Sequence, residues 1–188
     1  MPRAPCHCYT PGVLVLALDT ATPYLVLGLP HAERAIRLGR RHAEVLWGEL
    51  EQFLQENGIQ RQELEGTAVG QGPGSYTGMR VGIAAGLGLA RGLDIPVVGV
   101  DTQGAVALRY QGQVTVAHTT RNGLCYSAQY HSEEGKLTTL QAPCRSKLAE
   151  LHPRGLFSLD EPPSGMALAR LGAERLKAGH KQIEPLYL

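Results

Sequence analysis

Residues 71–92, QGPGSYTGMRVGIAAGLGLARG, are the stretch on which the organisation of this chain depends. The stretch begins as a Gly/Pro loop, and from Tyr76 onward it has the composition of a helix. That helix would carry glycine at positions 78, 82, 86, 88 and 92, and each interior glycine costs roughly 0.8–1 kcal/mol relative to alanine. A cost of this size needs a reason. Either the loop holds an anion, or another part of a protein approaches the helix closely.

The composition is typical of a globular protein with nearly balanced charges. Of the 188 residues, 43% are hydrophobic and 19% are charged, and the formal net charge is +1. No run of Lys or Arg is longer than two residues, so the sequence has no sign of the basic face with which a protein binds tRNA or DNA by itself. We find no membrane segment and no signal peptide, and we expect a cytoplasmic protein with reduced cysteines.

The pattern of apolar residues predicts an α/β fold. Apolar runs predict strands at 13–18, 24–29, 33–38, 67–70 and 96–100, and the 3.6-residue period predicts helices at 41–56 and 76–92. In the first of these helices, we expect Trp47 or Phe53 to anchor the core. Further on we expect helices at 102–110 and 166–178 and strands at 114–118, 124–131 and 137–141. Residues 1–12 read as a flexible leader, residues 13–101 as one lobe and residues 102–188 as a shortened second lobe.

The glycine loop resembles a phosphate-binding loop but matches neither common motif. A Walker A motif needs a Lys after its last Gly, and here Met79 and Arg80 follow Gly78. The dinucleotide fingerprint needs a third Gly where this chain has Thr77, although Asp101 stands where a ribose-binding acid could lie. The helix N-terminus still offers N–H groups to an anion, and a capped turn without a ligand is the alternative. The candidate vestigial phosphate or nucleotide loop comprises Asp19, Thr20, Gly72, Gly74 and Ser75.

The helix that follows has small residues on one face. Gly78, Gly82 and Gly86 recur every four residues and therefore make a flat surface for another backbone. That backbone could be the sheet of the same lobe or a helix of another protein. The sequence leaves both options open.

We find no self-sufficient set of catalytic residues. His42 begins the first helix, but Leu46 occupies the position where a second helical metal ligand would lie. No G-x-S-x-G motif is present, and the Cys6-His7-Cys8 triplet has no common zinc spacing. A protease would lack nucleophile, base and metal, so we rank that reading last. We expect no catalytic residue, no metal and no cofactor.

Three motifs identify a resemblance. Residues 18–22 (LDTAT), residues 72–82 (GPGSYTGMRVG) and the final EPLYL resemble the bacterial TsaB (YeaZ) family, and residues 121–126 (RNGLCY) resemble its Arg-x-Gly-x-x-Tyr element. The resemblance covers about two thirds of the chain. It implies an actin-like ATPase (ASKHA, ribonuclease-H-like) fold with a reduced second lobe. The family often has Asp where this chain has Thr119, two residues before the Arg-x-Gly element, which puts a residual nucleotide site in doubt.

The resemblance also implies a function. It suggests a non-catalytic, inactive protease homologue that serves as scaffold and activating subunit in making N6-threonylcarbamoyladenosine at position 37 of tRNA. Its partners would be the catalytic subunit TsaD and the ATPase TsaE, with tRNA bound only within the complex, and a homodimer could form through the same helices. The alternative is a stand-alone actin-like phosphotransferase using Asp19 and the loop at 72–78. The expected partner interface comprises His42, Leu46, Leu50, Gly78, Arg80, Gly82, Ile83, Gly86 and Leu87.

Overall fold

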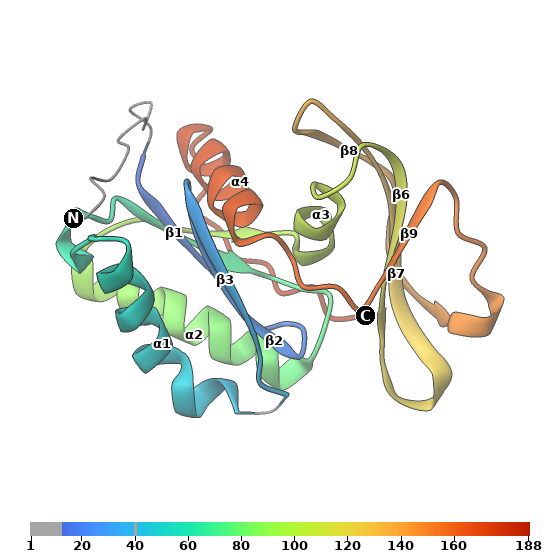
Figure 1. Ribbon diagram of the computed structural model, residues 1–188, viewed down its shortest axis with the longest axis horizontal. Helices are drawn as coiled ribbons and strands as arrows, with labels where there is room; N and C mark the ends of the chain where they lie inside the picture. Colours follow the sequence, from blue (N-terminus) through green and yellow to red (C-terminus); the bar gives the residue numbers. More distant parts are fainter. Residues whose placement is uncertain (1–12, 40) are drawn as a thin grey trace, which may run out of the picture.

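The computed structural model of this chain describes residues 13–39 and 41–188, which form two sheets with helices around and between them (Figure 1). The leader expected at 1–12 lies outside the described residues. The strands are β1 Val15–Asp19, β2 Tyr24–Leu29, β3 Ala32–Arg37, β4 Gly66–Gly70, β5 Val97–Val100, β6 Gly112–Thr119, β7 Leu124–Glu133, β8 Lys136–Lys147 and β9 Leu156–Leu159. The α-helices are α1 His42–Glu56, α2 Tyr76–Leu93, α3 Thr102–Ala107 and α4 Gly165–Lys177. Short 3₁₀ turns occupy Arg61–Glu63, Arg121–Gly123 and Leu148–Glu150.

The first sheet has five strands in the order β3-β2-β1-β4-β5. The first three strands form an antiparallel meander, while β4 pairs parallel to β1 and β5 parallel to β4. All residues of β1 and β4 are buried, because helices cover both faces of the sheet. The strands and helices expected between residues 13 and 100 are therefore confirmed, with end points shifted by one or two residues.

The two faces of the first sheet pack against different helices. Figure 1 shows α1 and α2 side by side on one face and α4 on the other. Leu16 and Leu18 of β1 join the core beneath α1 and α2, whereas Val15 and Ala17 join the core beneath α4. This alternation follows the two-residue period of a strand. Of the two core anchors expected on α1, Phe53 is buried, but Trp47 is 50% exposed.

The glycines of α2 explain how close the helix lies to the first sheet. A Cβ atom at Gly78 would overlap the backbone oxygen of Thr20, and one at Gly86 would overlap Cγ2 of Val69. A Cβ atom at Gly82 would lie 2.5 Å from Oγ1 of Thr20. The small-residue face of α2 thus faces β1 and β4 of the same chain. The expectation that these three glycines form a partner surface is wrong, because the chain's own sheet already occupies that face.

The second sheet has four strands in the order β8-β7-β6-β9. It repeats the first four positions of the first sheet: a three-stranded antiparallel meander followed by a parallel strand, β9, beside the first strand of the meander. The sequence did not predict β9. The short helix α3 packs on the face formed by Val114, Val116 and Tyr130, and separates this sheet from the first.

The end of the chain returns to the first sheet. Helix α4 packs on β1, β2 and β4, although it follows the whole second sheet in sequence. Beyond α4, the N–H of Gly99 in β5 donates to the carbonyl of Gln182 (3.1 Å), and the N–H of Leu186 donates to the carbonyl of Gln71 (2.9 Å). The expectation that residues 102–188 form one lobe is therefore incomplete, since their last part covers the first sheet.

Candidate functional site

The outward face of α1 and α2 differs from the one that the sequence suggested. Three of the expected interface residues lie on the buried side of α1: His42, Leu46 and Leu50. Three more lie on the buried side of α2: Gly78, Gly82 and Gly86. These six residues support the chain's own core and are unavailable to a partner in this conformation. Only Arg80 and Leu87 are exposed, and Ile83 is half-buried.

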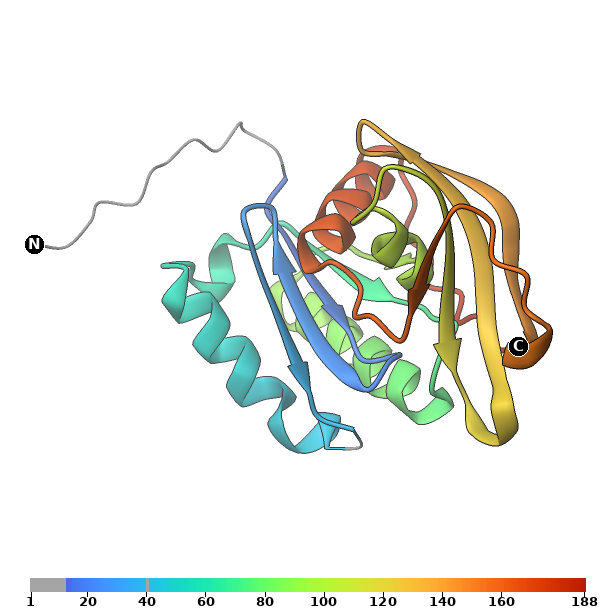
Figure 2. The ribbon, with the colours of Figure 1, turned by 45° about the vertical axis from the view of Figure 1, so that its right-hand side comes forward.

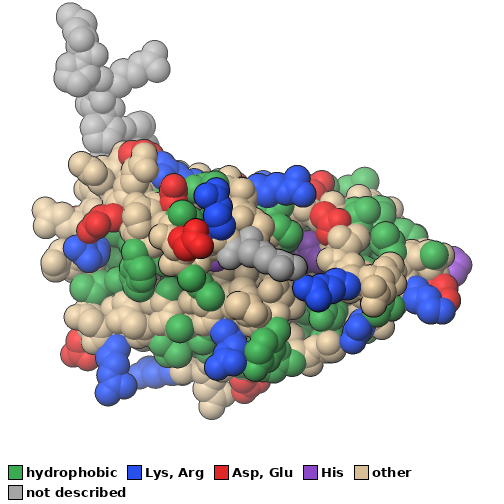
Figure 3. Space-filling view, turned by 90° about the horizontal axis from the view of Figure 1, so that it is seen from below, with side chains coloured by type: hydrophobic (Ala, Val, Ile, Leu, Met, Phe, Trp, Pro, Cys, Tyr) green, Lys and Arg blue, Asp and Glu red, His purple; other side chains and the backbone are tan. Residues whose placement is uncertain are grey.

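Other residues of these helices form the exposed surface. Trp47 on α1 is 50% exposed and Leu87 on α2 is 46% exposed. A Cβ atom added at Gly48 or Gly88 would meet no other atom within 4 Å, so both glycines face open space. Figure 3 views the molecule from below and shows apolar side chains on this surface, with Lys, Arg, Asp and Glu side chains scattered among them. We give the name helical face to the exposed residues Trp47, Gly48, Leu87 and Gly88 together with the half-buried Ile83. The sequence contains a signal for Gly88, because this glycine does not follow the four-residue spacing of the buried Gly78, Gly82 and Gly86.

An aromatic cluster lies at the N-terminal end of α2. The guanidinium of Arg80 lies 5.4 Å from the centre of the Tyr76 ring, and its Nη1 donates to the Tyr76 hydroxyl (3.1 Å). The Tyr76 ring in turn lies 5.1 Å from the ring of Tyr187, near the end of the chain. Both tyrosines are more than half exposed. Tyr76 and Arg80 therefore add a polar and aromatic end to the helical face.

The glycine loop is filled by its own chain. The N–H of Ser75 donates to the carbonyl of Ala21 (2.7 Å), and a Cβ atom at Gly74 would overlap that same carbonyl. The Ser75 hydroxyl caps α2 by accepting from the N–H of Gly78 (3.2 Å). Thr20 donates its hydroxyl proton to the carbonyl of Gly78 (2.7 Å). The polar groups that the sequence offered to a phosphate thus hold the loop against the end of β1.

Asp19 is also committed within the fold. Its carboxylate accepts from the N–H of Ala21 (2.7 Å) and from the hydroxyl of Thr102 (2.6 Å). Thr102 accepts in turn from the N–H of Gly72 (3.0 Å), which completes a buried link between β1, the glycine loop and α3. Burial raises the pKa of Asp19 to about 6, against the opposing effect of these hydrogen bonds. The carboxyl group of Asp19 therefore has a structural role, since it is buried and hydrogen-bonded within the fold.

Asp101, considered above as a ribose-binding acid, has a structural role as well. It caps α3 by accepting from the N–H of Gln103 (2.9 Å), and it accepts a 2.6 Å hydrogen bond from the hydroxyl of Tyr130 in β7. Desolvation raises the pKa of Asp101 and lowers the pKa of the nearby buried His118. This cluster joins the second sheet to α3. No sequence pattern connected its members.

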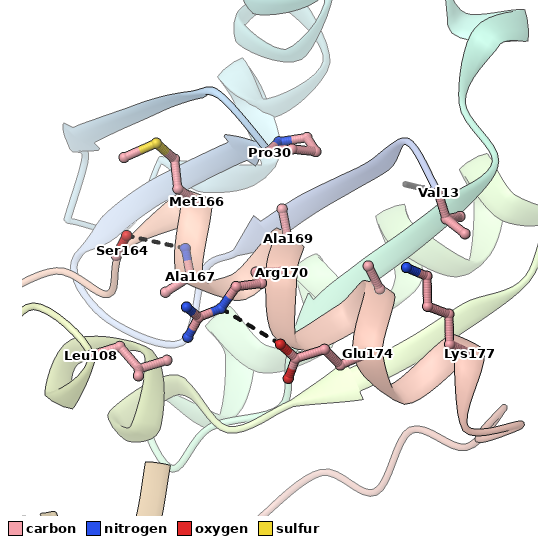
Figure 4. Close-up of a pocket in the computed structure, with 11 residues that line it drawn as sticks. Val13, Pro30, Leu108, Ser164, Met166, Ala167, Ala169, Arg170, Glu174 and Lys177 are labelled. Atoms are coloured by element: carbon pink, nitrogen blue, oxygen red, sulfur yellow. Dashed lines mark hydrogen bonds and ion pairs between the residues drawn. The ribbon is translucent and has the colours of Figure 1, made fainter. Parts of the chain in front are cut away.

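One hollow of the described surface lies away from the glycine loop. It measures about 510 Å³ and follows the outer side of α4, where Val13, Pro30, Ala169 and Ala173 contribute apolar atoms (Figure 4). Arg170 and Glu174 form an ion pair across one side of it (3.8 Å). A second hollow, of about 620 Å³, lies on the second sheet beside Gln129 and Cys144. Neither includes a residue of the glycine loop.

Metal-binding groups are dispersed over the part of the chain that the structure describes. Within residues 13–39 and 41–188, no three His, Cys, Asp or Glu side chains lie together as a metal site would require. His42 is buried with its Nε2 unpaired, and Leu46 lies one turn further along α1. The Cys6-His7-Cys8 triplet lies outside the described residues. No helix in the described part is long and apolar enough to cross a membrane.

Comparisons with known proteins identify relatives. A family model described as TsaD, tRNA N6-adenosine threonylcarbamoyltransferase, matches residues 37–182. An uncharacterized Mycobacterium tuberculosis protein is 33% identical over 164 residues, covering 84% of this chain and 76% of that protein. The tRNA threonylcarbamoyladenosine biosynthesis protein TsaB of Escherichia coli is 33% identical over 132 residues, covering 64% of this chain and 56% of that protein.

Solved structures share the fold. YeaZ from Pseudomonas aeruginosa superposes with a TM-score of 0.82 at 24% identity, covering 94% of this chain and 100% of that chain. An uncharacterized protein from the same organism, described as similar to peptidase YEAZ, superposes with a TM-score of 0.83 at 22% identity, covering 94% and 99%. These structures show the shared fold, and the family model over residues 37–182 with the sequence relatives shows that the chain belongs to the family of TsaD and TsaB (YeaZ) proteins.

Proposed function

We propose that this chain is a non-catalytic scaffold and activating subunit in the biosynthesis of N6-threonylcarbamoyladenosine at position 37 of tRNA. In this role it binds a TsaD-type catalytic subunit through the helical face. Relatives from Escherichia coli and Bacillus subtilis carry the name of that pathway. The observation that carries the proposal is the exposure of Trp47 and Leu87 on two neighbouring helices of a protein whose described residues gather no metal site.

The composition of the helical face supports a helix as the partner element. Gly48 and Gly88 have no atom within reach of an added Cβ, so a partner backbone can approach both helices closely. A Trp side chain buries about 150–250 Å² of accessible surface when it is fully covered. Since Trp47 is 50% exposed, a partner would cover roughly 100 Å² of it, which at about 25 cal/mol per Å² stabilises the complex by about 2–3 kcal/mol.

The remaining components follow from the same proposal. The ATPase TsaE joins the complex, and tRNA binds only to the assembly, in keeping with a net charge of +1 and no run of basic residues. The same helical face also serves a homodimer when the catalytic subunit is absent. The protein itself needs no cofactor, acts in the cytoplasm and has an actin-like fold, for which the shared strand order of the two sheets is the structural support.

A stand-alone phosphotransferase is not favoured. Such an enzyme would need free donors at the glycine loop and an accessible Asp19. In this loop, Ser75 donates its N–H to Ala21 and accepts from the N–H of Gly78 through its hydroxyl. Asp19 is fully buried and hydrogen-bonded to Thr102. Calorimetry with ATP and magnesium is expected to give no binding to the isolated chain. Tight binding followed by turnover would favour the enzyme instead.

The test is reconstitution of tRNA modification from the TsaD and TsaE subunits of the same organism. Modification is expected only when this chain is added, and Trp47→Glu is expected to reduce both co-elution with TsaD and product formation. Leu140→Glu is the matched control, because Leu140 is 51% exposed on the second sheet, away from the helical face. Full modification without this chain, or equal effects of the two substitutions, would overturn the proposal.

A further inference from the structure

Three of the four sheet edges in the described structure are protected against pairing with another strand. The edge strand β3 (AERAIR) is charged at three of its six positions. The edge of β5 is covered by the C-terminal segment, where Gly99 donates to Gln182. The edge strand β8 contains Pro143 and several basic residues, and its pairing with β7 is interrupted by irregularities. Charges, proline, bulges and coverage are the means by which proteins prevent edge-to-edge association.

The fourth edge, β9, has none of these protections. Its sequence is LFSL, and Leu156, Phe157 and Leu159 are 50%, 43% and 39% exposed. These three residues are among the ten large hydrophobic side chains exposed in the described structure, yet they come from one strand of four residues. Figure 2 shows β9 at one margin of the second sheet, with the long β7–β8 pair at the other.

The backbone of β9 has a defined free side. The N–H of Asp160, just after the strand, donates to the carbonyl of Ala117 in β6 (2.9 Å). Since backbone direction alternates along a strand, the N–H and C=O groups of Phe157 and Leu159 point away from β6. Among the described residues, none accepts from or donates to these outward groups. In the first sheet, the matching strand β4 has β5 in this place.

We propose that the free edge of β9 pairs with β9 of a second copy of this chain. The two strands run antiparallel about a two-fold axis at Ser158, so that Phe157 of each copy lies opposite Leu159 of the other. This register joins the outward backbone groups of both copies and continues the second sheet from one molecule into the next. The contact is distinct from the helical face, which lies on the first sheet.

Two further features favour a second copy over an unrelated strand. Phe157 and Leu159 pair with Thr115 and Ala117 of β6 and lie on the same face of the sheet, so two copies bring four apolar side chains together. Arg154 precedes the strand, and Asp160 and Glu161 follow it. An antiparallel copy brings opposite charges to both ends, whereas a parallel copy would bring like charges together. The strand is short, so the dimer is weak and reversible.

Sedimentation velocity of the full chain over a range of concentrations tests the proposal. A reversible dimer is expected, and Phe157→Lys is expected to weaken it by about tenfold or more, since a charge on an edge strand blocks pairing. The measurements are made in the Trp47→Lys background, which weakens the homodimer proposed above through the helical face, and Leu140→Lys is the control for the other sheet edge. A monomer at every concentration in that background would overturn the proposal, and so would a dimer that Phe157→Lys leaves unchanged.

A second variant tests the register without disturbing the fold. Residues directly opposite each other in a pair without mutual hydrogen bonds have Cα atoms about 4.5 Å apart, which suits a disulfide. Ser158→Cys replaces a buried side chain with one of similar size. Under mild oxidation it is expected to form a disulfide between two copies at position 158, identified by peptide mass spectrometry. If the disulfide is absent in the Trp47→Lys background while the dimer persists, the proposed register is overturned.

Discussion

Two glycines of α2 that look alike in sequence should respond oppositely to replacement by alanine. At Gly88, an added Cβ meets nothing within 4 Å, so Gly88→Ala is expected to raise the free energy of unfolding by about 0.8–1 kcal/mol through helix propensity alone. At Gly82, the added Cβ would lie 2.5 Å from Oγ1 of Thr20, which is buried and donates to the carbonyl of Gly78. The two positions therefore separate propensity from packing.

The magnitude at Gly82 follows from these contacts. Accommodating the methyl group displaces the Thr20 hydroxyl, and overpacking a core costs about 1–3 kcal/mol. The lost buried hydrogen bond adds about 1–3 kcal/mol. After the gain in propensity of about 1 kcal/mol, Gly82→Ala is expected to lower stability by about 1–5 kcal/mol.

Urea denaturation followed by circular dichroism measures both changes. The double variant Thr20→Ala with Gly82→Ala is the internal control, because removing the hydroxyl makes room for the methyl group. Its loss of stability should be smaller than the sum of the two single losses. Equal changes at Gly82 and Gly88, or strict additivity with Thr20→Ala, would refute the assignment of the glycine face to the first sheet.

Three further outcomes are expected. Burial raises the pKa of Asp19 from 3.8 to about 6, so the stability due to this carboxyl group is complete below its unfolded pKa and is lost as the pH rises through about 6. In denaturation measured at several pH values, the free energy of unfolding of Asp19→Asn should rise by up to about 3 kcal/mol relative to that of the wild type across this window, and parallel curves would contradict the prediction. Thr102→Val removes the donor to Asp19 and the acceptor for Gly72, and should lower the thermal midpoint while raising the pKa of Asp19 further; an unchanged midpoint would count against the buried link. Gly88→Leu should leave the fold intact and weaken binding to the TsaD-type subunit in a titration, whereas unchanged affinity would remove the helical face from the interface.

Most of the fold could be predicted from the sequence because its elements carry their own periodicity. The apolar run of β1 and the 3.6-residue pattern of α1 define those elements without tertiary information. Strand β9 was missed, because four residues between Gly155 and Asp160 are too few to show a period. Its place in the sheet depends on pairing with β6, which a local pattern cannot reveal.

The candidate site was harder to predict, since a face of small residues fits the chain's own sheet as well as a partner. The positions of Thr20 and Val69 beneath α2 decide between the two, and both are remote from the helix in sequence. The same applies to Asp19, whose nearest polar partner, Thr102, is 83 positions away. Trp47 is exposed although it was expected to anchor the core, because the helical period alone does not tell which apolar residue of a helix faces outward.

The return of α4 to the first sheet has a consequence for how the protein is made. As the chain leaves the ribosome, β1 to β5 emerge with α1 and α2, which can cover only one of their two faces. The opposite face, with Val15, Ala17 and Val98, stays uncovered while the entire second sheet is synthesised. An apolar surface exposed for that long favours binding by chaperones during translation. Chains arrested before α4 should therefore be the forms most prone to aggregate.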